Sequence, residues 1–366
     1  MKKFMLFATA VGLTLTSCVN DEETTMMGSR SVIAFDAPVM KTSRVNVSGE
    51  ITGVKYPQGE AFKVFSKIYT GNYAGWTTNT DDYFAEEGDS AKHEGGTYWS
   101  TSTIYYWPDA GYNLAFAAYS PANLGAASQA TTITRTEAGI QIADFVSEPK
   151  SDDQYDLMYS HTVYDRNKSN NAASAVSLKF EHALSSIVFS SQKSDEAAQY
   201  RITDLMVTGD FITKGSFNQG ITPATSGGAY TENENPKWNT EGVIPTTVQY
   251  EPTFNAFNVP AASPEIFTQG TSAILAIPQE VPQSAKVQVT YEKTSTGTTT
   301  THTAEIFLKD FKKATVEGTA VAEGIDEWER GKRYVYRIAF GKNQRIYFEP
   351  SITDWDQQPT LIYTIQ

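Results

Sequence analysis

Cysteine and histidine are scarce in this sequence, which has one cysteine, Cys18, and four histidines in 366 residues. The histidines are His93, His161, His182 and His302. A lone cysteine cannot form an intramolecular disulfide, and neither a cysteine pair nor a histidine pair has the spacing of zinc ligands. A Gly-x-Ser-x-Gly motif and a phosphate-binding glycine loop are also absent. We therefore expect no catalytic residues, no metal and no cofactor, and a protein that is not an enzyme.

Clusters of Lys and Arg are also absent, and the formal net charge is -13. Removal of an N-terminal leader that contains Lys2 and Lys3 would make this charge -15. Because an acidic surface repels the phosphate backbone, the composition excludes nucleic acid as a partner. No apolar run after the first 15 residues is long enough to span a bilayer, so we expect no transmembrane helix in the mature chain.

The one long apolar run covers residues 4–15, between two lysines and the small residues before Cys18. A cationic start, a short apolar core and small residues before a cut are typical of a secretion signal, here residues 1–17. Leu15-Thr16-Ser17-Cys18 resembles the lipobox of the bacterial lipoprotein signal peptidase. This implies that Cys18 is lipidated and becomes the first residue of the mature chain. The alternative is an ordinary buried thiol near a cleavage site.

Residues 18–31 are too polar to order themselves and form a predicted tether behind the lipid. Asp21, Glu22 and Glu23 resemble an export tag that sends some lipoproteins to the outer face of the outer membrane. A plain solvated linker explains the same acidic residues, so both interpretations stay open.

The remaining sequence favours strands, because Tyr, Phe and Thr are abundant and long amphipathic helical patterns are absent. Val176, Leu178 and Phe180 alternate with polar residues, as in a strand with one buried face. Such patterns recur at intervals of about 10 to 15 residues with turn signals between them, which is typical of β-sandwiches. The Asn/Ser/Ala-rich stretch 165–174 marks a boundary. We predict an all-β chain with an N-terminal sandwich domain at 32–175 and a C-terminal one at 176–366.

Three groups of residues follow one another along the chain: Tyr105-Tyr106-Trp107-Pro108 with residues 114–121, Leu178-x-Phe180-x-His182-x-Leu184, and Trp328-x-x-Gly331-x-x-Tyr334 with residues 352–355. With the lipobox-like stretch, they resemble the signatures of the fimbrillin family, the Mfa-like and FimA-like type V pilins. The resemblance implies a fimbrial subunit with two transthyretin-like β-sandwich domains, exported as a lipoprotein to the outer membrane and cell surface. It implies other fimbrial subunits as partners, in a homo- or hetero-polymer, and a host or bacterial surface glycan or protein as a further contact.

The resemblance also implies cleavage after an arginine, loss of the first strand and its replacement by a strand of the next subunit. The first predicted strand, which Pro38 ends, consists of Val32, Ile33, Ala34 and Phe35. Arg44 follows this strand, so a cut there releases it, whereas a cut at Arg30 frees the protein with the strand in place. We favour Arg44, with Arg30 as the alternative and an uncut surface arginine as the third interpretation.

The chain ends with a second alternating pattern, which suits a donated strand. Its apolar positions are Leu361, Tyr363 and Ile365. The alternative, favoured for an unpolymerised precursor, is an ordinary last strand folded back on its own domain, and both states can occur at different times.

A surface glycan-binding lipoprotein is the rival function. Its candidates for stacking on sugar rings are Trp76, Tyr83, Trp99 and Trp238.

Three smaller hypotheses concern single sites. Asp89-Ser90-Ala91 resembles a short O-glycosylation signal at Ser90, His182 is expected to be a structural histidine bonded to backbone, and the acidic loop 152–156 is expected to be solvated rather than a calcium site.

Overall fold

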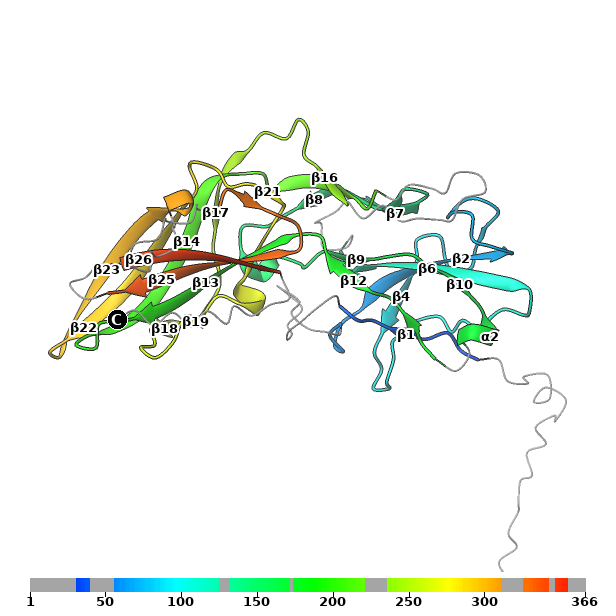
Figure 1. Cartoon of the computed structure of the whole chain (residues 1–366), viewed down its shortest axis with the longest axis horizontal. Helices are drawn as coiled ribbons and strands as arrows, with labels where there is room; N and C mark the ends of the chain where they lie inside the picture. The colour runs from blue at the N-terminus through cyan, green and yellow to red at the C-terminus, as the bar shows by residue number, and fades with distance from the viewer. Residues whose placement is uncertain are drawn as a thin grey trace, which may run out of the picture.

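The computed structural model describes residues 31–39, 56–124, 132–171, 174–220, 236–310, 325–341 and 346–354. Nearly all regular structure in these ranges is β-strand, and the sheets lie in layers along an elongated molecule (Figure 1). The predicted all-β sandwich class is confirmed. No helix within these ranges has the length and apolar character needed to cross a bilayer.

An eight-stranded sheet forms the centre of the N-terminal half, around the antiparallel pair β2 (Phe62–Thr70) and β6 (Tyr112–Ser120). β6 is buried on both faces, with Leu114 and Phe116 in one core and Ala115 in another. A strand covered on both faces reads as a continuous apolar run, as residues 114–119 do. The other strands are β3 (Asp81–Asp82), β4 (Asp89–Lys92), β5 (Ser100–Thr101), β9 (Met158–Ser160), β10 (Val163–Arg166) and β12 (Phe180–His182).

Two further layers cover this sheet, one above and one below in Figure 1. The first is a four-stranded antiparallel sheet whose Ile140, Ile142 and Phe217 share a core with Ala115. It consists of β7 (Thr132–Thr136), β8 (Gly139–Val146), β15 (Lys214–Asn218) and β16 (Lys237–Asn239). The second layer is residues 31–39, where β1 (Phe35–Asp36) pairs in parallel with β11 (Val176–Ser177).

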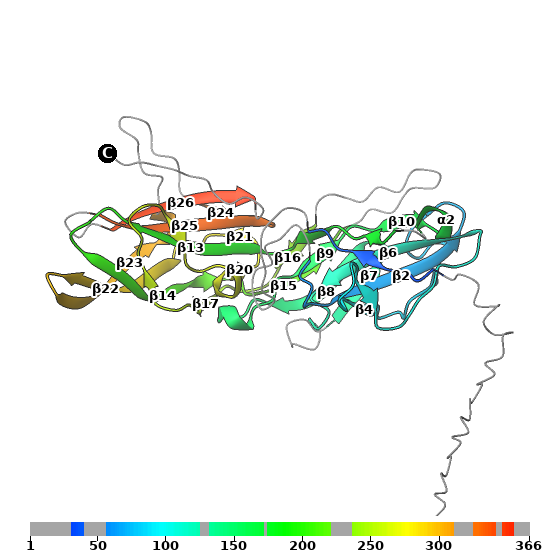
Figure 2. The same cartoon turned by 90° about the horizontal axis from the view of Figure 1, so that it is seen from below.

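The C-terminal half consists of two stacked sheets, which Figure 2 separates into β13, β25 and β26 on one side and β14, β22 and β23 on the other. β13 (Ser185–Lys193) runs parallel to β25 (Lys332–Phe340), and β14 (Gln199–Phe211) pairs with β22 (Lys286–Ser295). Alternate side chains of both sheets fill one core. The remaining strands are β17 (Thr246–Tyr250), β18 (Phe257–Asn258), β19 (Glu265–Ile266), β20 (Ile274–Ala276), β23 (Thr298–Phe307) and β26 (Ile346–Asp354).

Short elements complete the described ranges. The strands β21 (Gln279–Glu280) and β24 (Glu327–Trp328) pair with each other. The helical turns are α2 (Lys168–Asn171), η1 (Ser151–Asp153), η2 (Gly270–Ser272) and η3 (Leu308–Asp310).

The chain crosses between the two halves more than once. β11 and β12 follow residue 175 but pair with β1 and β9, and β15 and β16 return to pair beside β8. The predicted division at 175/176 therefore separates strands that share a sheet. The reason is that local alternation identifies a strand but carries no information on its partner. The division into tandem domains stays a prediction.

Candidate functional site

Residues 31–39, which we name the N-terminal segment, lie extended in the core of the N-terminal half. Every second side chain points inward: Ile33, Phe35 and Ala37 are 0% exposed and Val39 is 3% exposed. The intervening residues are half-buried or exposed, with Val32 at 48%. This period of two is that of a β-strand with one buried face.

One edge of the N-terminal segment is hydrogen-bonded to the chain between β4 and β6. Phe35 and Trp99 exchange two backbone hydrogen bonds, with N···O distances of 2.8 and 2.9 Å. The Ile33 N–H donates to the Tyr105 carbonyl at 2.9 Å, and the Trp107 N–H donates to the Ser31 carbonyl at 3.0 Å. Residues 99–107 therefore act as the antiparallel neighbour of the segment.

The other edge is bonded in parallel to residues 176–180. The N–H groups of Val176, Leu178 and Phe180 donate to the carbonyls of residues 34, 36 and 38 at 2.8, 2.8 and 2.9 Å. β1 itself ends at Asp36, ahead of Pro38, but the parallel pairing continues through Pro38 to Val39, beyond the end expected from the sequence. Proline has no N–H to donate, but its carbonyl accepts normally, so it is tolerated where only the carbonyl is used.

Phe35 is at the centre of this arrangement. Its ring meets three other rings edge to face, with centroid distances of 5.5 Å to Phe116, 6.3 Å to Phe84 and 6.5 Å to Phe62. Burial of an Ile, Phe or Val side chain contributes about 1.5–3 kcal/mol. The three larger inward residues of the segment therefore contribute roughly 5–9 kcal/mol, an upper bound because the unfolded chain is partly collapsed.

The segment is connected to the rest of the described chain through residues 40–55, and the two ends of this connection lie together. The Tyr56 N–H donates to the Ala37 carbonyl at 2.8 Å, and Tyr56 itself is 1% exposed. A cut anywhere between residues 40 and 55 would separate the N-terminal segment covalently from the body. Only hydrogen bonds and side-chain packing would then hold it.

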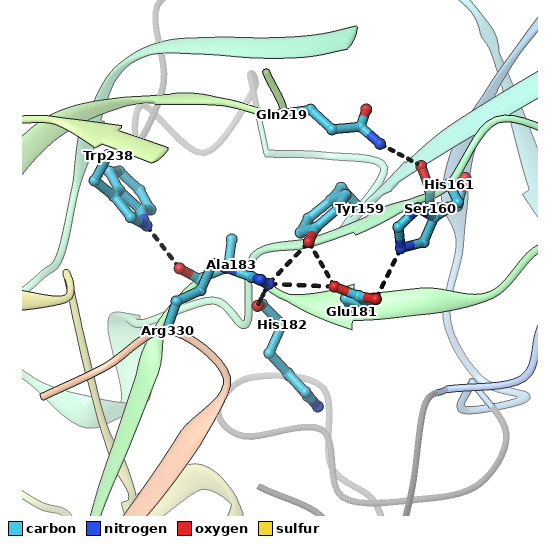
Figure 3. Close-up of polar contacts among 9 residues, drawn as sticks. All are labelled: Tyr159, Ser160, His161, Glu181, His182, Ala183, Gln219, Trp238 and Arg330. Carbon is cyan, nitrogen blue, oxygen red and sulfur yellow. Dashed lines mark hydrogen bonds and ion pairs between the residues drawn. The ribbon is translucent and has the colours of Figure 1, made fainter. Parts of the chain in front are cut away.

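A second site, made of polar side chains, joins the two halves of the molecule (Figure 3). Glu181 of β12 accepts from the Tyr159 hydroxyl at 2.6 Å, lies 2.8 Å from His161 Nε2, and pairs with Arg330 at 3.3 Å. Arg330, from the turn between β24 and β25, also donates to the His182 carbonyl at 3.3 Å. We name Tyr159, His161, Glu181 and Arg330 the junction cluster.

The junction cluster stabilises the ionised form of its carboxylate. The hydrogen bond from His161 lowers the pKa of Glu181 to about 2, helped by the Tyr159 hydroxyl and the charge of Arg330 and opposed by burial. Nearby, the Trp238 indole N–H donates to the Ala183 carbonyl at 2.6 Å, as Figure 3 shows. The chemistry of this site is that of a structural clamp.

The comparisons with known proteins decide the family. A model of the fimbrillin-like family matches residues 57–355, most of the chain. The chain belongs to the fimbrillin-like family. The match confirms the resemblance that the sequence motifs indicated, and it begins after the N-terminal segment.

One solved structure shares the fold of this chain. A fimbrial protein from Bacteroides vulgatus has a TM-score of 0.53 at 16% identity, covering 89% of this fimbrillin-like chain and 100% of its own. Candidate cell adhesion proteins from Bacteroides uniformis and Bacteroides ovatus have TM-scores of 0.44 at 13% identity. They cover 89% and 90% of this chain and 99% of their own. Among curated proteins, none matches the sequence.

Several predicted site residues of this fimbrillin-like chain lie outside the described ranges. They are Cys18, Arg30, Arg44, Leu361, Tyr363 and Ile365. The predicted first strand, residues 32–35, lies within them and forms the first part of the N-terminal segment. Ala37 and Val39 were not predicted as inward residues, although their spacing continues the alternation of Ile33 and Phe35. Residues 99–107 were not predicted as the neighbour of the segment, because this pairing is non-local.

His182 is 4% exposed, and its Nδ1 lies 3.0 Å from the carboxylate of Asp156, itself 2% exposed. The partner that the structure shows for the ring is this carboxylate, where a backbone group was expected. A buried imidazole is satisfied well by a carboxylate, and this partner comes from the loop before β9. Asp152 and Asp153 are exposed, and no cluster of metal-ligating side chains occurs in the ranges that the structure describes.

The aromatic residues proposed for glycan stacking have different environments. Trp76 and Trp99 are 3% and 1% exposed, so their faces are not available to a sugar. Trp238 is half-buried and bonded at the junction, whereas Tyr83 borders a surface depression described below. Ser90 lies half-buried in β4, where its carbonyl accepts from the Ser102 N–H at 2.9 Å.

Proposed function

We propose that this chain is a structural and adhesive fimbrial subunit, assembled by strand exchange after proteolysis, and that it is not an enzyme. The observation that carries the proposal is the N-terminal segment. It fills the core with alternate side chains, is hydrogen-bonded on both edges, and is joined to the body through residues 40–55. Such a segment is one that a strand from another molecule can replace with little change elsewhere.

The first step of the proposed assembly is a cut after Arg44, which lies between the N-terminal segment and Tyr56. The segment then leaves together with the upstream chain and its lipid on Cys18. Its departure unpairs the backbone of residues 99–107 and 176–180 and exposes the apolar side chains around Phe35. Exposed strand edges and an apolar core are unfavourable in water, so the vacated site requires a replacement.

The proposed replacement is the tail of the next subunit. Leu361, Tyr363 and Ile365 are spaced two residues apart, as Ile33, Phe35 and Ala37 are. An extended tail can therefore restore backbone hydrogen bonds and place an apolar side chain in three of the four vacated positions. Since the exchange replaces similar contacts, it gives a polymer without a large input of free energy.

The assembly proposal is tested with the purified chain and an arginine-specific protease. We expect a ladder of heat-sensitive oligomers on gels after treatment, and we expect deletion of residues 360–366 to abolish it. Arg44→Ala should prevent assembly, whereas the matched variant Arg30→Ala should leave it unchanged. Oligomers that persist without the tail would contradict the strand-exchange mechanism, although the family assignment would stand.

The proposed location is the cell surface, at the outer membrane before the cut and in the fimbrium after it. Other fimbrial subunits, of the same or another sequence, are the proposed partners. N-terminal sequencing of protein from intact cells distinguishes the two states, because a lipidated chain is blocked at Cys18 and a chain cut after Arg44 begins at Val45. A start at Ser31 would indicate cleavage at Arg30 and contradict the proposed site.

A further inference from the structure

A surface depression of about 410 Å³ is lined by residues near the end of β2, at the start of β6 and in the loops beside them. We name it the tyrosine depression. Its volume is within the range of small-molecule sites. The lining residues that matter here are Tyr83, Ile104, Tyr105, Tyr106, Asp109 and Tyr112.

Large apolar side chains are exposed together at this place. Ile104 is 64% exposed, Tyr112 is 46% exposed and Tyr106 is 36% exposed. Single exposed apolar residues are common on protein surfaces, but several around one hollow indicate a binding site. A tyrosine side chain combines a flat apolar ring with a polar hydroxyl, so this lining offers both kinds of contact.

The walls are held in place before any ligand arrives. Tyr105 stacks on Phe84 with a centroid distance of 4.0 Å, and the Tyr83 hydroxyl donates to the Tyr106 carbonyl. The backbone of Tyr105 accepts from the Ile33 N–H at 2.9 Å, so the N-terminal segment supports the same wall. A preformed site loses less conformational entropy when it binds.

Four polar side chains of the lining have no hydrogen-bond partner among the described residues. Within the described ranges, the hydroxyls of Tyr105, Tyr106 and Tyr112 and the carboxylate of Asp109 make no hydrogen bond or ion pair with the protein. Three hydroxyls can donate or accept, and one carboxylate accepts. This set, next to aromatic faces, complements a molecule with an apolar face and several hydroxyls around its edge.

We propose that the tyrosine depression binds a neutral hexose ring of a surface glycan. The C–H face of a pyranose packs on an aromatic ring, and its hydroxyls bond to tyrosine hydroxyls and to the carboxylate. A basic peptide is the main competitor, because aromatic faces also attract cations. The lining offers a multiply charged peptide a single charge partner, the Asp109 carboxylate, whereas a neutral sugar needs only hydrogen-bond groups and a ring face.

The test uses the intact, uncut chain, so that its outcome does not depend on strand exchange. A printed array of neutral glycans built from glucose, galactose, mannose and N-acetylhexosamines is probed first, with hexalysine as the cationic competitor. The strongest oligosaccharide is then titrated by calorimetry. We expect Tyr112→Ala to raise its Kd about tenfold, as the loss of a central aromatic contact does. The matched control Tyr98→Ala, at 43% exposure and outside the depression, should leave the Kd unchanged.

Asp109→Asn and Tyr112→Phe separate the polar contacts from ring stacking and keep the shape of the site. Each should weaken binding less than Tyr112→Ala does. Three results would overturn the proposal: no neutral glycan bound on the array, equal affinity for wild type and Tyr112→Ala, or displacement of the glycan by hexalysine. Circular dichroism of each variant verifies that the fold is retained, so that a loss of binding reports on the depression.

Discussion

Phe35→Ala tests whether the N-terminal segment is part of the core. The side chain is 0% exposed and meets three aromatic rings, so its truncation removes a large apolar group from a closed site. Truncation of a buried Phe to Ala costs about 3–5 kcal/mol. Both edges of the N-terminal segment are hydrogen-bonded, so the backbone cannot move into the cavity without breaking these bonds. We therefore expect a loss of unfolding free energy in the upper part of this range.

The measurement is urea unfolding followed by tryptophan fluorescence and circular dichroism. The matched control is Val32→Ala, which changes an exposed side chain three residues away in the same segment and should alter the free energy of unfolding by less than about 0.5 kcal/mol. After protease treatment, the variant segment should also dissociate faster, by about a thousandfold for 4 kcal/mol. A loss below about 1 kcal/mol for Phe35→Ala would refute the packing of the segment and, with it, the basis for strand exchange.

Two further predictions concern the junction between the two halves, one in the junction cluster and one at Trp238. The folded-state pKa of Glu181 is about 2, below its ordinary value of 4.5, so its ionisation stabilises the folded state above pH 4.5 and this contribution is lost as the pH falls towards 2. After allowance for solvent screening, we expect the free energy of unfolding to fall by about 2 kcal/mol over this pH range. Urea unfolding at several pH values measures this fall, which should be absent in Glu181→Gln. If the variant showed the same pH dependence as the wild type, the clamp would be contradicted. Trp238→Phe keeps the aromatic packing but removes the donor to Ala183, and we expect a loss of about 1 kcal/mol by thermal unfolding. A melting temperature equal to that of the wild type would show that water replaces the indole N–H.

The sequence allowed part of the candidate site to be predicted. The inward positions Ile33 and Phe35 follow from alternation, which is a local property of a strand. Val39 was missed because Pro38 was taken as a strand end, although a proline carbonyl can still accept a hydrogen bond. The partner of His182 could not be predicted either, because Asp156 is 26 residues away and nothing local relates the two side chains.

The tyrosine depression could not be predicted from the sequence either. Tyr105 and Tyr106 belong to a motif visible in the sequence, but only the structure shows that Tyr105 is half-buried and Tyr106 is exposed. The spacing of Trp76 and Trp99 likewise did not distinguish these buried residues from surface aromatic residues. Burial of an aromatic residue depends on which sheets cover it.

The sequence by itself determined that the chain is all-β, which strand faces are apolar, and that the ends carry a lipobox-like stretch and an alternating tail, because these depend on residue type and period. Only the tertiary structure decided that residues 31–39 lie between residues 99–107 and 176–180, that β6 is covered on both faces, and that Arg330 reaches Glu181 from the other half. The physical reason is that backbone hydrogen bonds are the same for every residue, so pairing between distant strands is selected by the packing of the whole core.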